Sequence, residues 1–173
     1  PYDCSKACAD ILARSYAKSF GLNVTVARSV NIYGPGDVNW DRIIPGTIKS
    51  LLKNKKPVLR SNGRFLRDYL YVDDVVQGYL KLGSLMLKDK SINGKAINFG
   101  SNKPISVINL VKIILKKFDK KSNFLIIKKK AKNEIKNQYS RYDVAKKVLK
   151  WNPKTNLNTG LSKSIKWYEE NIR

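Results

Sequence analysis

A tyrosine and a lysine stand four residues apart at Tyr2 and Lys6. In an α-helix such residues lie about 40° apart on one face, so the lysine ammonium can sit beside the tyrosine ring. A nearby positive charge favours the phenolate and lowers the tyrosine pKa from about 10 toward the range of a general base. Many helices also carry this spacing as an ordinary surface pair, so the pair alone leaves both interpretations open.

Further motifs follow the Tyr-Lys pair in a fixed order. A strand-like segment runs into Arg28–Gly36, Arg67-Asp-Tyr-Leu-Tyr-Val-Asp-Asp74 follows, and Trp151-Asn-Pro153 stands near the end. This order and spacing resemble the NAD-dependent epimerase/dehydratase family, the extended short-chain dehydrogenases that act on nucleotide sugars. The resemblance covers essentially the whole chain, and residues 36–47 and 60–63 look like the CDP-glucose 4,6-dehydratase branch. One departure is Lys150, where the family usually has a glycine.

The resemblance implies chemistry for the Tyr-Lys pair. Tyr2 would be the catalytic base that takes the proton from the sugar C4 hydroxyl as hydride passes to the nicotinamide of NAD or NADP. Lys6 would lower the pKa of Tyr2 and hold the nicotinamide ribose. The expected reaction is a 4,6-dehydration or an epimerisation of a nucleoside-diphosphate sugar in polysaccharide biosynthesis, and the residues present do not decide between the two.

The resemblance also implies substrate contacts. Asn31 and Arg67 would bind the diphosphate, and arginine suits this task because its guanidinium can bind two phosphate oxygens at once. The alternative for Arg67 is a surface pair with Asp68. The nucleotide pocket would be lined by Arg42, Ile44 and Pro45 and, at its edge, by Gln138.

A glycine-rich turn that could cradle a dinucleotide is not found in the sequence. Such a turn follows the first strand of a dinucleotide fold and opens a helix, whereas Gly34-Pro-Gly36 follows a late strand and opens none. We therefore expect an amino-terminal glycine-rich half to be absent, and the 173 residues alone to be inactive and unable to bind NAD. The domains implied are a dinucleotide-binding remnant at 1–34 and 68–88, and a substrate-binding domain at 35–67 and 89–173.

Alternating helices and strands predict an α/β fold, which the resemblance identifies as the carboxyl-terminal part of a Rossmann-type extended short-chain dehydrogenase with its smaller α/β substrate-binding domain. Helical periodicity covers residues 3–20, 45–52, 75–82, 106–118, 143–150 and 159–172. Strands are expected at 24–27, 96–99 and 124–127, with a hairpin of 58–60 and 65–72 around Asn62-Gly63 and a loop at 31–36. Expected helix caps are Ser106 and either Asp73 or Asp74.

The composition is strongly basic, with 35 Lys and Arg against 13 Asp and Glu, no histidine and a net charge of +22. Such a chain attracts polyanions, so the alternative function is a non-catalytic basic module that contacts nucleic acid. Most lysines are scattered as on a solvated surface, and the block Lys128–Lys130 lacks the aromatic residues that stack on bases. Nucleic acid is therefore the less favoured partner.

The remaining expectations concern location, metals and assembly. No apolar run approaches the roughly 20 residues that span a bilayer, so we expect a cytoplasmic protein without a membrane segment. Cys4 and Cys8 offer too few ligands for zinc in a chain without histidine, and we expect them to be small buried thiols. The expected partners are a nucleoside-diphosphate sugar and, in the complete protein, a second copy of the chain.

Overall fold

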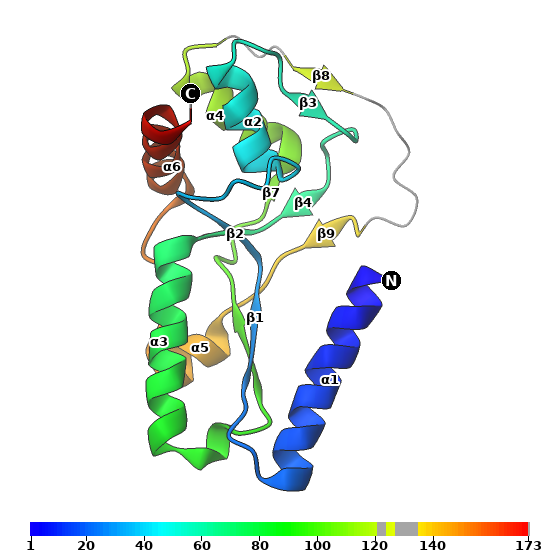
Figure 1. The fold of residues 1–173 in the computed structure, drawn as a ribbon, viewed down its shortest axis with the longest axis vertical. Helices are drawn as coiled ribbons and strands as arrows, with labels where there is room; N and C mark the ends of the chain where they lie inside the picture. Colours follow the sequence, from blue (N-terminus) through cyan, green and yellow to red (C-terminus); the bar gives the residue numbers. More distant parts are fainter. Residues whose placement is uncertain (121–123, 127–134, 173) are drawn as a thin grey trace.

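The computed structural model describes residues 1–120, 124–126 and 135–172. The molecule is a mixed α/β structure with two lobes that meet at a narrow waist (Figure 1). The residues Ile127 and Lys128–Lys130, which entered the sequence predictions, lie outside the described part. No helix in the described part is both long and apolar enough to cross a membrane.

The lower lobe is built on a pair of parallel strands. Strands β1 (Val26–Ser29) and β6 (Ala96–Phe99) pair in the register Val26↔Ala96. Helices α1 (Tyr2–Phe20) and α3 (Val72–Lys88) flank this pair on opposite sides in Figure 1. The 3₁₀ turn η1 (Lys90–Ile92) and helix α5 (Asp143–Leu149) complete the lobe.

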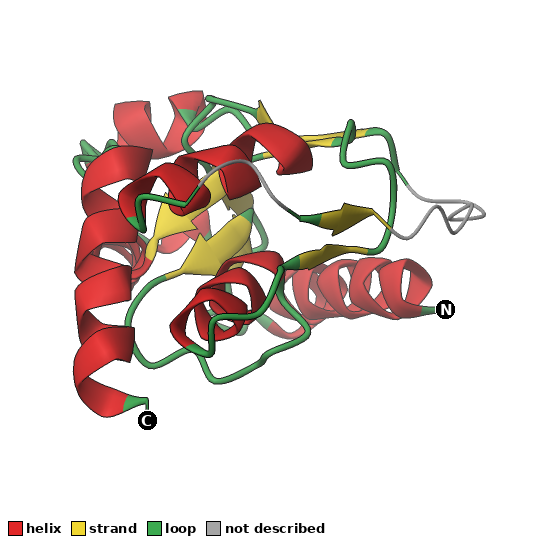
Figure 2. Ribbon diagram, turned by 90° about the horizontal axis from the view of Figure 1, so that it is seen from above, coloured by secondary structure: helices red, strands yellow, loops and turns green. Residues whose placement is uncertain are grey.

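The described part of the upper lobe contains helices and several very short strands, and Figure 2 shows the molecule from this end. Its helices are α2 (Ile43–Leu52), α4 (Val107–Lys117) and α6 (Leu157–Asn171). The strands β3 (Val58–Leu59) and β8 (Leu125–Ile126) pair in parallel, and β4 (Leu66–Arg67) lies between β7 (Ile105–Ser106) and β9 (Asn137–Gln138). At the waist, β2 (Asn31–Tyr33) pairs in parallel with β5 (Tyr69–Tyr71).

Each lobe has its own apolar core. The upper core packs α2, α4 and α6 together, with Ile48, Leu110 and Ile114 fully buried. The lower core packs α3, β6 and α5 around Phe99 and Trp151, whose ring centroids are 5.0 Å apart. The predicted domain boundaries stay a prediction; in this packing β6 and α5, which were placed with the substrate-binding domain, lie in the lower core with α3.

Several local predictions are confirmed. Pro45 lies in the first turn of α2, where its missing N–H costs nothing. The Ser106 hydroxyl caps α4 by accepting a hydrogen bond from the backbone N–H of Asn109. The conformation of Lys150 was not predicted: its φ of 49° is left-handed, the conformation for which glycine is usual at the end of a helix.

The predicted hairpin is wrong. Strand β3 pairs with β8, while β4 pairs with β7 and β9, so the segments on either side of Asn62-Gly63 separate into different sheets. Gly63 adopts a positive φ of 71°, which glycine tolerates best, in the bend that leads the chain from β3 to β4. A local turn signal was therefore correct, but long-range pairing decided the partners.

The loop predicted at 31–36 is confirmed only for residues 34–36, and the acidic cap predicted for α3 is wrong. Residues 31–33 form β2, because β5 offers them a parallel partner that local sequence cannot reveal. Helix α3 begins after Tyr71 without a side-chain cap. Asp74 is instead buried, and its carboxylate accepts hydrogen bonds from the backbone N–H groups of Lys154 (3.1 Å) and Thr155 (2.9 Å).

The two cysteines are exposed, which corrects the prediction that they are buried. They lie on α1, and Ala17 is the buried residue of that helix. The apolar side chains Ile11, Leu12, Tyr16 and Phe20 of α1 are also exposed. In the described part of the chain, no cluster of three or more histidine, cysteine or acidic side chains could bind a metal ion.

Candidate active site

A cleft of about 740 Å³ lies where the amino-terminal end of α1 faces the strands of the waist and upper lobe. Its walls come from segments far apart in the sequence. The lining residues are Tyr2, Asp3, Ser29, Val30, Asn31, Ile32, Tyr33, Asp37, Arg42, Ile43, Ile44, Pro45, Arg67, Tyr69, Val107 and Gln138. All the predicted site residues except Lys6 therefore line one cleft.

Tyr2 and Lys6 lie together at the exposed start of α1. The Lys6 Nζ is 5.6 Å from the centroid of the Tyr2 ring, as the helical spacing predicts, and 72% of Tyr2 is exposed. Lys6 itself faces a smaller hollow of about 430 Å³ between α1 and β1, which it shares with Asp10, Arg14 and Arg28. The pair thus connects the cleft with this neighbouring hollow.

The predicted diphosphate ligands lie at the start of β2 and the end of β4. The side-chain amide of Asn31 donates one hydrogen bond to the backbone carbonyl of Asp68 at 3.0 Å, which leaves its second N–H for other partners. The Arg67 guanidinium donates to the carbonyl of Leu66 at 2.8 Å and lies over the ring of Phe65. Its side chain is thereby held along the cleft wall.

A surface pair between Arg67 and Asp68 is not what forms. The Asp68 side chain is fully buried, and its carboxylate accepts hydrogen bonds from Ser101, Asn102 and Ser140. Alternation along an extended chain points the two neighbours to opposite sides, so Arg67 faces the cleft while Asp68 faces the interior. That alternative for Arg67 is therefore wrong.

Arg42 occupies the N-cap position of α2 and is oriented by a residue that the sequence analysis missed. Its Nη1 lies 3.1 Å from the Asp37 carboxylate, and the Tyr168 hydroxyl donates to the Asp37 carbonyl at 2.7 Å. Helix α6 therefore steadies the loop that presents Arg42. The Asp-x-Asn spacing of Asp37 and Asn39, which forms a side-chain turn, was the available signal.

Tyr69 is a second cleft residue that sequence reasoning missed. Burial raises its pKa to about 12, although the nearby Arg67 charge opposes this shift. Because it stays protonated at neutral pH, Tyr69 can donate a hydrogen bond but cannot act as a base. Tyr2, at the opposite side of the cleft, is the tyrosine that remains open to solvent and ligand.

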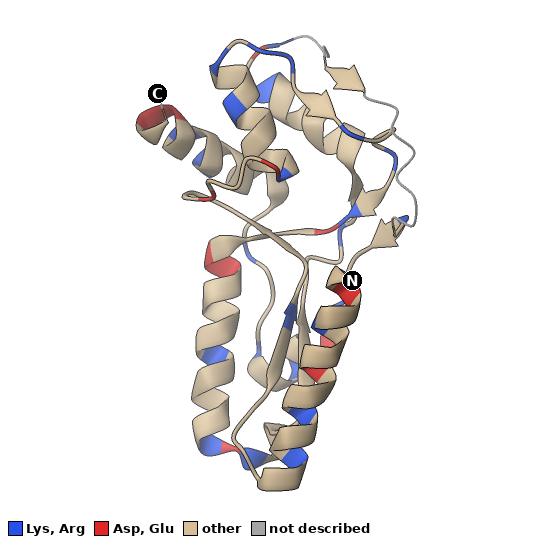
Figure 3. Cartoon of the chain, turned by 45° about the vertical axis from the view of Figure 1, so that its right-hand side comes forward, with Lys and Arg blue, Asp and Glu red and all other residues tan. Residues whose placement is uncertain are grey.

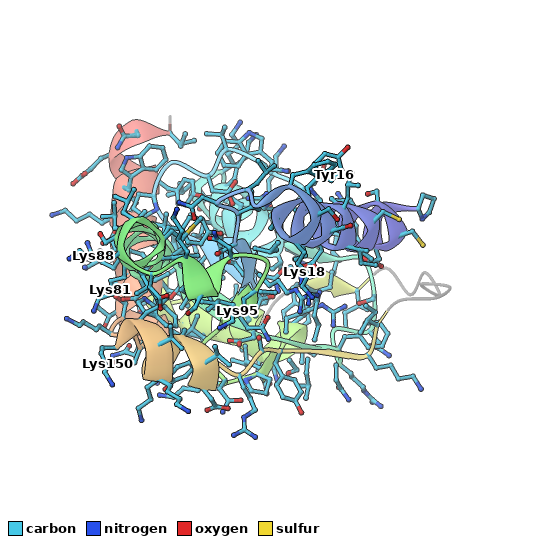
Figure 4. All side chains as sticks on the ribbon, turned by 90° about the horizontal axis from the view of Figure 1, so that it is seen from below. Tyr16, Lys18, Lys81, Lys88, Lys95 and Lys150 are labelled. Carbon is cyan, nitrogen blue, oxygen red and sulfur yellow. The ribbon has the colours of Figure 1, made fainter. Side chains whose placement is uncertain are left out.

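Among the described residues that line the cleft, the ionised side chains are two acidic and two basic, in contrast to the basic excess of the chain as a whole. Asp3 and Asp37 face Arg42 and Arg67 in its lining. Elsewhere the basic residues are spread over many elements (Figure 3), and Lys88 and Lys95, which do not line the cleft, lie at the lower end of the molecule, seen from below in Figure 4. What distinguishes the cleft from the rest of the surface is therefore the arrangement of its polar and charged side chains, and not a larger positive charge.

Comparison with known proteins decides the family. The profile of the NAD dependent epimerase/dehydratase family matches residues 1–100. This chain belongs to that family. Its relatives include human dTDP-D-glucose 4,6-dehydratase, 31% identical over 99% of this chain and 49% of that protein. The UDP-glucuronate 4-epimerase of Thermodesulfobacterium geofontis is 30% identical over 99% of this chain and 51% of its own.

Solved structures of family members have the same fold. The dTDP-glucose 4,6-dehydratase of Bacillus anthracis in complex with NAD superposes with a TM-score of 0.87 at 28% identity, over 99% of this chain and 52% of that one. The UDP-glucuronic acid 4-epimerase of Bacillus cereus, in complex with UDP-glucuronic acid and NAD, gives 0.88 at 25% identity, over 98% and 52%. The chain spans about half the length of the relatives it matches. The expected fold, a Rossmann-type α/β part of an extended short-chain dehydrogenase, is thus confirmed.

Proposed function

We propose that this chain provides the proton-transfer residue and the substrate-binding wall of an NAD-dependent enzyme that transiently oxidises C4 of a nucleoside-diphosphate sugar. The observation that supports this most is the shared cleft. Tyr2 on α1 and the diphosphate candidates Asn31 and Arg67 come from three separate elements, yet they line the same cavity. The family's members act on such sugars, by dehydration or by epimerisation, according to their names.

In this proposal Tyr2 accepts the proton of the C4 hydroxyl. Tyr2 is 72% exposed at the start of α1 and lines the cleft, so it can reach a sugar there, and the Lys6 Nζ lies 5.6 Å from the centroid of its ring. Residues for the nicotinamide end of NAD are present, because Tyr2 and Lys6 share one open face. When bound, NAD would accept the hydride from C4.

The substrate extends from Tyr2 along the strands of the waist. Asn31 and Arg67 bind the diphosphate through N–H donors, which suits its doubly charged oxygens. The first turn of α2, with Arg42, Ile44 and Pro45, contacts the nucleoside, and Gln138 lies at the edge. Residues 36–47 and 60–63 lead us to propose a cytosine base, although the relatives named above act on dTDP and UDP sugars.

Both outcomes considered for the reaction begin with the same ketone. A ketone at C4 acidifies the C5–H bond, which allows water to leave across C5 and C6 in a dehydratase, and the hydride taken from C4 then returns to C6. In an epimerase the hydride instead returns to the opposite face of C4, which restores an alcohol of inverted configuration. We propose that the 173 residues alone catalyse neither reaction, because they contain no glycine-rich turn for the dinucleotide phosphates. We also propose that the active protein is a dimer.

Calorimetric titration of the 173-residue chain with CDP, UDP and dTDP tests the proposal. Losing a charged hydrogen-bond partner costs about 1.5–3 kcal/mol, so Arg67→Ala should weaken binding roughly tenfold to over a hundredfold. Arg64→Ala is the matched control, because Arg64 is an exposed arginine nearby that does not line the cleft. It should change the dissociation constant by less than about twofold, as expected for a solvated surface charge.

Salt separates the pocket from the alternative of a basic module for nucleic acid. Binding to a phosphate backbone falls steeply with salt concentration, because counterions are released, whereas binding of one diphosphate in a cleft falls less. Equal losses from Arg67→Ala and Arg64→Ala, together with a steep salt dependence, would contradict the proposed pocket and favour diffuse attraction to a basic surface.

A further inference from the structure

Segments of the described chain that cross between the lobes converge on two buried aspartates. Asp68 lies in one such segment, between β4 and β5. It is hydrogen-bonded to three other segments that pass between the lobes, at residues 31, 101–102 and 140. Asp74 is bonded to a further crossing, at residues 151–155. Asp68 is the one of the two that lies beside the cleft, between the lining residues Arg67 and Tyr69.

The Asp68 carboxylate is satisfied by neutral groups. Its Oδ2 accepts from the backbone N–H groups of Ser101 (3.0 Å), Asn102 (3.1 Å) and Ser140 (3.4 Å), and its Oδ1 accepts from the Ser101 hydroxyl. Its side chain is fully buried. A carboxylate is an acceptor-only group, so it can gather several donors that no neutral side chain could gather in the same way.

The backbone of Asp68 connects this network to the cleft. Its carbonyl accepts from both the backbone N–H (3.2 Å) and the side-chain amide (3.0 Å) of Asn31. Its N–H donates to the carbonyl of Gln138 at 3.1 Å, and its neighbour Arg67 stands opposite Gln138 in the β4–β9 register. Of the three predicted substrate ligands, Asn31 and Gln138 are therefore hydrogen-bonded to the Asp68 backbone, and Arg67 is its neighbour in the chain.

The glycine at position 100 supports the importance of this contact. A Cβ at Gly100 would lie 2.9 Å from Asp68 Oδ2 and 2.5 Å from the carbonyl oxygen of Ser140. Both distances are far below van der Waals contact. Only a glycine therefore lets the chain after β6 approach closely enough to present its N–H groups to the carboxylate.

The strands alone cannot fix the geometry of this wall. β4, β7 and β9 have two residues each, and β2 and β5 have three. The β2–β5 pair and the β7-β4-β9 sheet are separate sheets without a shared ladder. Short ladders make few hydrogen bonds, so the relative placement of Asn31, Arg67 and Gln138 must be set by contacts beside them.

We propose that Asp68 is the positioning residue of the substrate wall. Its buried carboxylate fixes Asn31, Arg67 and Gln138 relative to one another and to Tyr2 across the cleft. This inference rests on the proposed function for its effect on binding, because it treats these residues as substrate ligands. Its structural part, that the carboxylate orders the backbone at Asn31, does not depend on the ligand.

The test compares Asp68→Asn with Asp74→Asn in the 173-residue chain. Both variants remove a buried carboxylate that accepts backbone N–H groups, and Asp74 does not line the cleft. Both should lower the denaturation midpoint. Asp68→Asn should also weaken nucleoside-diphosphate binding about tenfold, the scale of one charge-assisted hydrogen bond, whereas Asp74→Asn should change it less than about twofold. Because Asp68→Asn can fail to fold, Ser101→Ala provides a milder variant that keeps the carboxylate and removes the hydroxyl, which donates to Asp68 and accepts from the Lys103 N–H.

Amide hydrogen exchange provides a readout without ligand. The Asn31 N–H bonds to the Asp68 carbonyl and not to its carboxylate, so it reports on the position of the wall. Its exchange should accelerate at least several-fold in Asp68→Asn or Ser101→Ala and stay unchanged in Asp74→Asn. Unchanged exchange at Asn31 in the first two variants, or equal acceleration in all three, would overturn the proposal. If the wild type bound no nucleoside diphosphate, the proposed function would fail, and the exchange at Asn31 would still decide the role of Asp68.

Discussion

The helices α1 and α3 flank the same parallel strands but are held in opposite ways. Helix α3 buries Val75, Gly78 and Leu82 in the lower core, and Asp74 bonds it to the chain before α6. Helix α1 buries Ala17, while Leu12 is 58% and Phe20 67% exposed. Figure 4 shows Tyr16 pointing outward from α1.

The two helices support different parts of the proposed function: α3 supports the substrate-binding wall, and α1 carries the proposed catalytic base. The wall that would bind the substrate continues into α3 through β5, so it is rooted in the chain's own core. Tyr2 stands on a helix joined to β1 and its surroundings mainly by polar contacts, with Asp10 bonded to Arg28 at 2.6 Å and Arg14 Nε bonded to the Gly94 carbonyl at 3.1 Å. Its apolar face has no cover within the described residues. Binding can therefore be expected of these 173 residues more readily than turnover.

The largest expected effect concerns the chemistry of α1. In a protein that joins this chain to a dinucleotide-binding half, Tyr2→Phe should lower kcat by about 10²–10⁴-fold, because it removes the general base. The dissociation constant for the nucleoside diphosphate should stay nearly the same. Steady-state kinetics beside calorimetry would measure both. A variant that kept more than half of the rate would show that Tyr2 is not the base.

Matched leucine truncations compare the packing of the two helices. Leu82 is 5% exposed, so Leu82→Ala should lower the free energy of unfolding by about 2–5 kcal/mol. Leu12→Ala on α1 should change it by less than about 0.5 kcal/mol, the scale of surface substitutions. Urea denaturation would measure both. Similar losses would mean that the apolar face of α1 is packed after all.

Two glycines of α3 sharpen the comparison within one helix. A Cβ at Gly78 would lie 2.6 Å from the Phe99 ring, whereas nothing lies within 4 Å of one at Gly83. Gly78→Ala should therefore cost about 1–3 kcal/mol by overpacking, and Gly83→Ala should stabilise the helix by up to about 1 kcal/mol. Thermal denaturation of the two variants gives the sign of each effect directly. Stabilisation by both would contradict the close packing of α3 on β6.

The smallest expected effect concerns the ion pair of α1. The hydrogen bond from Arg28 holds the pKa of Asp10 below its usual value of 3.8. Because the folded-state pKa is lowered, the pair stabilises the fold above pH 3.8, and this contribution is lost as the pH falls through the lowered pKa. The pair is partly exposed, so it contributes about 0.2–1 kcal/mol to the free energy of unfolding. Asp10→Asn should remove that much at pH 7 and less at pH 2, where the carboxylate is more protonated. An equal loss at both values would rule out the charge as the cause.

Local sequence predicted those parts of the fold that local physics determines. Helical periodicity gave the helices, and Ser106 and Pro45 were correct because a cap and a first-turn proline act on their own helix. The hairpin and the loop at residue 31 were wrong because short strands take partners from distant segments. The prediction that the cysteines are buried was wrong, because periodicity shows that one face of a helix is apolar but not whether another element covers that face.

The candidate site was predicted through a family resemblance, and the structure adds what surrounds it. The cleft brings Tyr2, Asn31, Arg67 and Gln138 together, although the roles of these residues stay predictions. Asp37 and Asp68 were missed as supporting residues, because a buried acceptor is recognised by its donors and those donors come from remote segments. No spacing rule in a single sequence connects residue 68 with residue 140.

The most direct test of the account is to locate a bound nucleoside diphosphate on the 173-residue chain. Backbone NMR shifts recorded during a titration with CDP or UDP would identify the contacted residues at moderate salt. The account predicts shifts at Asn31, Arg67, Tyr69 and Gln138, with smaller ones at Tyr2 and Asp3. Shifts confined to the lysines at the lower end, such as Lys88 and Lys95, or the absence of any saturable shift, would contradict it.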